Sequence, residues 1–127
     1  MKYIPNDNAD FIAASHEDPK NPGVLKRVIA TAADLQAGQV QMVNWAKLPV
    51  GHSFQKHYHE DMQEVFVLLK GSVEMTVETE SVSMSAGDSV IVGVREVHQM
   101  ANVGDSEAEY IVFGVASGEG GQTIVVE

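Results

Sequence analysis

The sequence predicts an all-β fold, a barrel or sandwich built from short antiparallel strands. Segments rich in β-branched and aromatic residues follow one another closely, and the turn signals between them often contain glycine. The sequence shows no internal repeat and no low-complexity tract. At 127 residues the chain is long enough for one hydrophobic core and too short for two domains.

An amino-terminal arm precedes the predicted barrel. In residues 1–23 Asn, Asp and Pro dominate, and Pro19, Pro22 and Gly23 mark turns at its end. Residues 24–127 form the predicted β-barrel domain. A short helical turn is expected at residues 31–35, which begin like a capping box. The predicted strands are residues 25–30, 40–47, 54–59, 64–69, 72–77, 82–85, 89–92, 98–102, 109–115 and 123–126.

Composition and charge exclude several classes of protein. The net charge of -10 argues against a general affinity for nucleic acid or for an anionic membrane. The chain has no cysteine, which excludes disulfides and thiol catalysis. No segment has the roughly 18 apolar residues of a membrane span, and the amino terminus has no apolar run of signal-peptide length. We expect a cytoplasmic, bacterial-type enzyme or binding protein.

Three histidines and one glutamate form the most informative pattern. His57 and His59 are one residue apart, so on a strand both side chains point to the same face. Glu64 follows closely enough to return on the neighbouring strand of a hairpin, and His98 comes later in the chain. Imidazole nitrogens and a carboxylate oxygen together suit a divalent transition metal such as Fe, Mn, Ni, Cu or Zn. The pattern predicts a metal site inside a small β-barrel.

The glycines around this pattern add a family resemblance. From Gly51 to Gly71 the sequence fits G-x5-H-x-H-x4-E-x6-G at every fixed position, and this closely resembles the first signature motif of the cupin superfamily. The resemblance covers roughly residues 38–115, most of the chain.

The second cupin motif, usually G-x5-P-x-G-x2-H-x3-N, is present with changes. Gly87, His98 and Asn102 stand at the matching positions. Gly93 stands where proline is expected, and Arg95 stands where the second glycine is expected. The spacing is therefore kept while two turn residues differ.

The resemblance implies a single-domain double-stranded β-helix, also called a jelly-roll barrel. It also implies that His57, His59, Glu64 and His98 hold one metal, because residues at these motif positions do so in metal-binding cupins. The superfamily includes dioxygenases, isomerases, epimerases, decarboxylases, sugar-binding proteins and storage proteins. Fold and metal are therefore better determined than the reaction.

Alternation along the strands predicts an apolar pocket around the metal. If Glu64 points inward, so do Phe66 and Leu68, and Met100 follows His98 on the same face. We expect Phe66, Leu68 and Met100 to line the substrate pocket. Met42 or Trp45, and Phe113, are further candidates whose faces the sequence does not fix.

Four other polar residues have simpler interpretations. His52 would face away from His57 on a regular strand, which predicts a surface or rim position. His16 lies in the polar arm and is expected to be solvated. Arg95 is either a solvated loop residue or a clamp for carboxylate or phosphate at the pocket mouth. Asn102 is expected to satisfy backbone groups of a turn.

The ligand set restricts the chemistry that we expect. Four protein ligands leave about two positions free in an octahedral shell, which favours a small ligand that binds through two oxygens. Iron would permit dioxygen chemistry, and the other metals would permit enolisation, hydrolysis or decarboxylation. We expect a metal-dependent enzyme, dioxygenase-like or isomerase-like, with Glu64 as one candidate general base. The alternatives are a module that binds a sugar or small metabolite without turnover, and a barrel that the metal only stabilises.

The arm also suggests self-association. It is too polar to form its own core, but two apolar pairs, Tyr3 with Ile4 and Phe11 with Ile12, can pack on a neighbouring chain. Exchange of a terminal segment is a common route to dimers, so we expect a homodimer.

Overall fold

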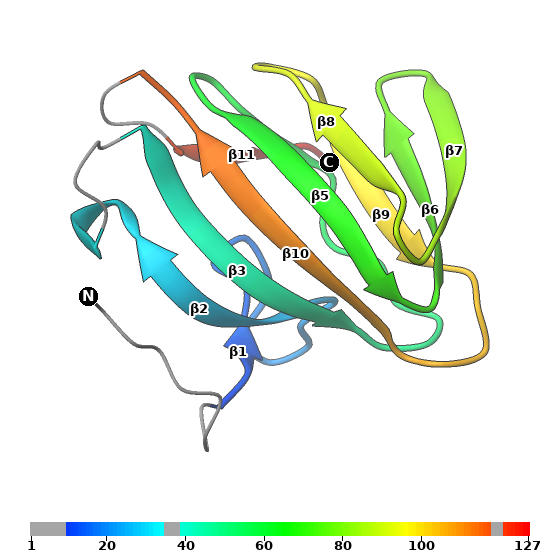
Figure 1. The fold of residues 1–127 in the computed structure, drawn as a ribbon. Helices are drawn as coiled ribbons and strands as arrows, with labels where there is room; N and C mark the ends of the chain where they lie inside the picture. The colour runs from blue at the N-terminus through cyan, green and yellow to red at the C-terminus, as the bar shows by residue number, and fades with distance from the viewer. Residues whose placement is uncertain (1–9, 35–38, 118–120) are drawn as a thin grey trace.

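Two antiparallel sheets pack face to face and enclose one hydrophobic core (Figure 1). The computed structural model describes residues 10–34, 39–117 and 121–127. The all-β jelly-roll prediction is confirmed, because the described chain is made of strands apart from one short 3-10 helix, η1 (Ala32–Asp34). The strands are β1 (Ile12–Ala13), β2 (Leu25–Thr31), β3 (Val40–Leu48), β4 (His57–His59), β5 (Gln63–Lys70), β6 (Ser72–Val77), β7 (Glu80–Ser85), β8 (Ser89–Val92), β9 (His98–Asn102), β10 (Ala108–Val115) and β11 (Thr123–Val125).

The chain crosses repeatedly between the two sheets. The larger sheet has the order β1-β2-β3-β10-β5-β8, and the smaller one has the order β11-β4-β9-β6-β7. In Figure 1, β3, β10 and β5 lie side by side as long strands, with β9 and β11 behind them. Strands far apart in sequence therefore become neighbours, which brings side chains from distant motifs to one interior.

Alternation along the strands builds the core. In β10, for example, Ala108, Tyr110 and Val112 are buried, and the residues between them are more exposed. Gly71 closes the turn between β5 and β6 with a φ of 95°, and a Cβ there would lie 2.9 Å from the Cα of Ala108. The buried core residues are Ala14, Val24, Ala46, Leu48, Phe54, Phe66, Leu68, Val73, Met75, Met84, Val92, Met100, Ala108, Tyr110 and Val112.

Three elements differ from the sequence prediction. The strand expected at residues 54–59 is shorter, because only His57–His59 pairs as β4 while Ser53 makes an isolated bridge to Ala101. The helical turn expected at residues 31–35 is η1, and residue 35 lies outside the described residues. Strand β1 in the arm was not expected, since a two-residue strand carries no periodicity; it pairs Ile12 with Lys26.

Asn102 ties two connections together, as expected from the sequence. Its side-chain Nδ2 donates to the carbonyls of Leu48 and Ser106, each at 2.9 Å. Its Oδ1 accepts the backbone N–H of Gly104 at 2.9 Å. Asn102 therefore links the end of β3 to the turn between β9 and β10, which is a structural role.

Among the described residues, no helix is long and apolar enough to cross a membrane.

Candidate metal centre

Four side chains converge in the barrel interior. His57 and His59 lie on β4, Glu64 on β5 and His98 on β9. All four residues are buried, and their candidate ligand atoms lie within 4.8 Å of one another. Strands β4 and β9 pair directly, whereas β5 belongs to the opposite sheet. The cluster predicted from the sequence thus comes together from both layers of the fold, and it could hold a metal ion.

Backbone carbonyls orient the three imidazoles. The Nδ1 atom of His57 lies 2.5 Å from the carbonyl oxygen of Gln55, and that of His98 lies 2.9 Å from the carbonyl oxygen of Glu96. The Nδ1 of His59 lies 3.3 Å from the carbonyl oxygen of Gln122. A carbonyl can only accept, so Nδ1 carries a hydrogen in each ring. Nε2 is the other nitrogen, which can hold a proton toward Glu64 or, without that proton, bind a metal. This outer hydrogen bonding is the arrangement that metal-binding histidines use.

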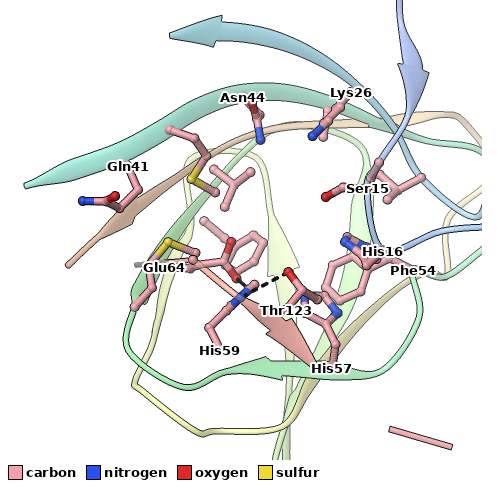
Figure 2. Close-up of a pocket in the computed structure, with 18 of the residues that line it drawn as sticks. Ser15, His16, Lys26, Gln41, Asn44, Phe54, His57, His59, Glu64 and Thr123 are labelled. Carbon is pink, nitrogen blue, oxygen red and sulfur yellow. Dashed lines mark hydrogen bonds and ion pairs between the residues drawn. The ribbon is translucent and has the colours of Figure 1, made fainter. Parts of the chain in front are cut away.

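Glu64 is hydrogen-bonded to two of the three histidines. Its Oε1 lies 2.9 Å from Nε2 of His59 (Figure 2). The same oxygen lies 3.1 Å from Nε2 of His98. Burial alone would raise the pKa of Glu64, but the hydrogen bonds from both histidines outweigh it and lower the pKa to about 2. Burial likewise opposes the charged form of His59, yet Glu64 raises the pKa of that histidine. Glu64 is therefore a carboxylate in a position to coordinate a cation.

His57 is held in its neutral form. Burial lowers the pKa of His57 to about 3, and the neighbouring rings of His16 and His98 act in the same direction. A neutral imidazole is the form that binds a metal. Three imidazoles and one carboxylate, all buried and converging, therefore fit a divalent transition metal by donor type and by orientation.

A cavity of about 210 Å³ opens beside this cluster. Phe66 lines it, as the sequence analysis expected, together with His57, His59 and Glu64. Leu68 and Met100 are fully buried in the core and are not among the residues that line the cavity. Alternation fixes the face to which a side chain points, but it does not fix the depth along the strand at which the cavity ends.

The uncertain aromatic and sulfur side chains divide between the two faces of the larger sheet. Met42 lines the cavity. Trp45 lies between the inward residues Asn44 and Ala46, so it faces outward, where its Nε1 donates to Glu109 at 3.1 Å. Phe113 pairs with Val43 and Val65 and shares that outward face.

His16 occupies a different place from the solvated position expected for it. Its ring stacks on that of His57 at a centroid distance of 4.2 Å and meets Phe54 edge-on at 5.6 Å. Its Nε2 is buried and has no hydrogen-bond partner among the described residues. The sequence prediction was wrong because the arm folds back on the barrel, where the carboxylate of Glu17 accepts the N–H of Val24 at 3.0 Å.

Lys26, Asn44 and Thr123 also line the cavity, although the sequence analysis did not single them out. Asn44 is the residue that a sequence signal could have found, because asparagine is disfavoured inside strands and this one lies among apolar neighbours. Lys26 carried no such signal, since a lysine on a strand normally faces water.

The two altered turn positions lie between β8 and β9. The N–H of Gly93 donates to Oε1 of Glu96 at 2.6 Å, and a proline there would lack this hydrogen. Arg95 has a φ of 63°, the conformation that glycine adopts most easily, and its N–H donates to the carbonyl of His59 at 2.7 Å. Its side chain is exposed and pairs with Glu60 at 3.2 Å, outside the cavity. Arg95 is thus a solvated turn residue, and His52 is also exposed as expected.

The sequence has a curated relative over part of its length. An uncharacterised protein of Methanocaldococcus jannaschii is 26% identical over 72 residues, which are 57% of this chain and 58% of that protein. The chain therefore matches little more than half the length of this relative.

Two solved structures share the fold closely. A predicted oxalate decarboxylase from Thermotoga maritima has a TM-score of 0.80 and 20% identity, covering 91% of this chain and 100% of that one. A sugar phosphate isomerase of the cupin superfamily from Silicibacter pomeroyi has a TM-score of 0.74 and 20% identity, covering 91% of this chain and 76% of that one. At this identity the likeness is one of fold.

A family model agrees with the motif spacing and the barrel topology. The model described as "Cupin domain" matches residues 44–114, more than half of the chain and including all four clustered residues. The resemblance seen in the sequence is therefore confirmed, and the protein belongs to the cupin family.

Proposed function

We propose that this protein is a metal-dependent enzyme for a small, oxygen-rich organic substrate. His57, His59, Glu64 and His98 would hold one divalent transition metal, and the substrate would bind in the adjoining cavity. The observation that carries the proposal is that three of the four candidate ligands, His57, His59 and Glu64, line an open cavity of about 210 Å³. A purely structural metal site is more often closed by its protein ligands.

The reaction class that we propose is dioxygenase-like or isomerase-like. A bound metal would supply Lewis-acid chemistry or, as iron, chemistry with dioxygen. Phe66, Val112 and Met62 would exclude water from one wall of the cavity. Glu64 is the candidate that would accept a proton, because it is the carboxylate that lines the cavity beside His57 and His59.

The two similar structures support a small, oxygen-rich substrate. One is described as a predicted oxalate decarboxylase and the other as a sugar phosphate isomerase. Both descriptions name small molecules with several oxygens close together. A cavity smaller than the range typical for drug-sized ligands agrees with that size.

A second candidate function is a module that binds such a molecule without turnover. Among the described residues that line the cavity, Glu64 is the only carboxylate, and it is hydrogen-bonded to His59 and His98. A separate general base of that type is therefore missing from the described wall. In this alternative the ligand would be released unchanged.

The experiment begins with elemental analysis of the purified protein. The metal-free protein is then reloaded with Fe, Mn, Ni, Cu or Zn and screened against enols, 2-oxo acids and keto-sugars, by oxygen uptake and by product analysis. We expect turnover with at least one metal, and Glu64→Gln should reduce both metal affinity and turnover. Binding without any metal-dependent turnover would favour the second candidate.

The metal ligands are tested separately from the reaction. The double variant His57→Ala with His59→Ala should lose tight metal binding, because two of the four donors are removed. His52→Ala is the matched control, since His52 is an exposed histidine close in sequence. Full metal stoichiometry in the double variant would refute the proposed site.

A further inference from the structure

We propose that Lys26 and Asn44 form a second recognition site in the cavity, which selects ligands carrying an anionic group and a hydroxyl beyond their metal-binding oxygens. The proposal rests on the proposed function, because it assumes that a ligand occupies the cavity beside the metal. Figure 2 shows Lys26 and Asn44 on one side of the cavity and His57, His59 and Glu64 on the other. A ligand that spans the cavity would contact both sides.

Lys26 is a cation whose ammonium group has no partner among the described residues. It lies on β2 and lines the cavity together with Val24. No described residue forms an ion pair or a hydrogen bond with its ammonium group, although the chain carries a net charge of -10. A half-buried ammonium beside an apolar wall is costly unless an anion approaches it. A carboxylate or phosphate of the ligand is the anion that this wall lacks.

Asn44 offers a buried polar group that also lacks a partner among the described residues. The residue is 7% exposed, and its Oδ1 has no hydrogen-bond partner among the described residues. Its cross-strand neighbours are Val28 on β2 and Val112 on β10, whose side chains cannot bond to it. Leaving a buried polar atom unpaired costs about 1–3 kcal/mol in free energy of folding. A hydroxyl of the ligand would satisfy it.

The ring of His16, which lies against His57, adds a third polar atom to the cavity wall. Its buried Nε2 has no partner among the described residues, and the stack on His57 at 4.2 Å fixes the ring plane. Three polar groups around a cavity of about 210 Å³ have no partner among the residues that the structure describes. They point to a compact ligand, such as a hydroxylated dicarboxylate or a phosphorylated hydroxy acid.

The test compares three probes that share a 2-hydroxycarboxylate end. Lactate has no second anionic group, malate has a second carboxylate, and 3-phosphoglycerate has a phosphate. Calorimetric titration of metal-loaded protein should show malate or 3-phosphoglycerate binding at least about tenfold more tightly than lactate, the size expected for a charged hydrogen bond. Whichever is preferred identifies the anion as carboxylate or phosphate.

Substitution of Lys26 gives the decisive comparison. Lys26→Met keeps a long, unbranched side chain but removes its charge. It should abolish the preference for malate or 3-phosphoglycerate over lactate, while leaving lactate affinity and metal stoichiometry unchanged. Lys20→Met, which removes an exposed charge, is the control and should retain the preference. Equal affinity of the wild-type protein for the three probes, or no binding of any, would overturn the proposal.

Asn44 has a signature that a merely structural residue would not give. Asn44→Leu should raise the thermal stability, because an unpaired buried polar group is replaced by an apolar one of similar size. It should also weaken the binding of tartrate, which carries one hydroxyl more than malate, about fivefold to tenfold. Higher stability with unchanged affinity would remove Asn44 from the site. Metal stoichiometry, measured on the same samples, separates the outcomes: metal-loaded protein without a preference refutes the second site alone, whereas protein that takes up no metal refutes the proposed function.

Discussion

The imidazole of His16 lies against the imidazole of His57, with centroids 4.2 Å apart and planes inclined by 28°. One ring comes from the arm and the other from β4, so the arm contributes directly to the candidate metal centre. The stack covers one face of His57, while the carbonyl of Gln55 holds its Nδ1. His16 therefore helps to position His57, a proposed metal-binding residue, and does not itself bind the metal.

Removal of this stack should weaken metal binding. We expect His16→Ala to lower the affinity for the metal about tenfold, the lower end of the effect of groups that orient a ligand. Competition with a chromophoric chelator measures this. His52→Ala, at an exposed histidine, should bind metal like the wild type. Unchanged affinity in His16→Ala would show that the stack does not orient His57.

Glu17 anchors the arm to the barrel. Its two carboxylate oxygens accept the N–H groups of Val24 at 3.0 Å and Gln55 at 3.2 Å. We expect Glu17→Ala to lower the free energy of unfolding by about 2–4 kcal/mol, because two backbone donors lose their partners. Urea unfolding measures the change. Asp18→Ala, at the next and exposed carboxylate, should have a much smaller effect.

The same residue predicts a pH dependence. Burial raises the pKa of Glu17 above its ordinary value of 4.5, although the backbone hydrogen bonds oppose the shift. The folded protein thus keeps this proton to a higher pH than the unfolded chain. The stability that Glu17 contributes is complete below the unfolded pKa and is lost as pH rises through the folded pKa. The difference in unfolding free energy between wild type and Glu17→Gln should therefore shrink as the pH rises through the folded pKa of Glu17. A growing difference would contradict this sign.

Arg95 should be replaceable by glycine with a gain in stability. Its φ of 63° is strained for a residue with a side chain, and its ion pair with Glu60 is exposed and so contributes little. We expect Arg95→Gly to raise the free energy of unfolding by about 0.5–1 kcal/mol. Arg95→Ala is the control, because it removes the ion pair and keeps the strain. Equal stabilities of the two variants would argue against the backbone explanation.

The centre of the outward face of the larger sheet is apolar. Apolar residues alternate with core residues along the four neighbouring strands β3, β10, β5 and β8. The face of an antiparallel sheet that contacts water is normally polar. Row by row, Trp45 pairs with Ile111 and Ile111 with Val67, while Phe113 pairs with Val65 and Val65 with Ile91. We define these residues, with Val43, as the outer face.

Tyr3 and Ile4, which the sequence analysis proposed for packing in a homodimer, lie outside the described residues. We expect the outer face to contribute to the homodimer as well. A second copy is the partner that fits, because an uncharged centre avoids the repulsion between two chains of net charge -10. A twofold axis would pair the same patch on both copies, and apolar patches of this kind commonly mark interfaces.

One exposed residue tests this interface. Ile91 is 66% exposed, so Ile91→Lys should leave the fold intact and shift the protein to a monomer, measured by light scattering at micromolar concentration. Val103→Lys is the matched control, because Val103 is 62% exposed in the turn after β9. A wild-type monomer, or an unaffected dimer in Ile91→Lys, would refute the interface.

Local periodicity explains which parts of the molecule could be read from sequence. The spacing of His57 and His59 fixes a common face, and the β-strand pattern around Glu64 and His98 places both inward. Such statements need only the alternation of a strand. The position of His16 and the depth of Leu68 depend on contacts between distant segments, which alternation does not contain. Asn44 could be predicted only in part. An asparagine is unusual in a strand, which the sequence shows, but the strands that pair with it could not be known.

The placement of the four clustered residues on opposite sheets has a mechanical consequence. Glu64 belongs to the larger sheet, whereas the three histidines belong to the smaller one. An ion bound by all four residues would cross-link the two sheets, so that neither sheet could separate from the other without releasing the ion. Backbone amides of β4, β5 and β9 should then exchange with deuterium through one common opening event in the loaded protein, and through separate, faster events in the metal-free protein.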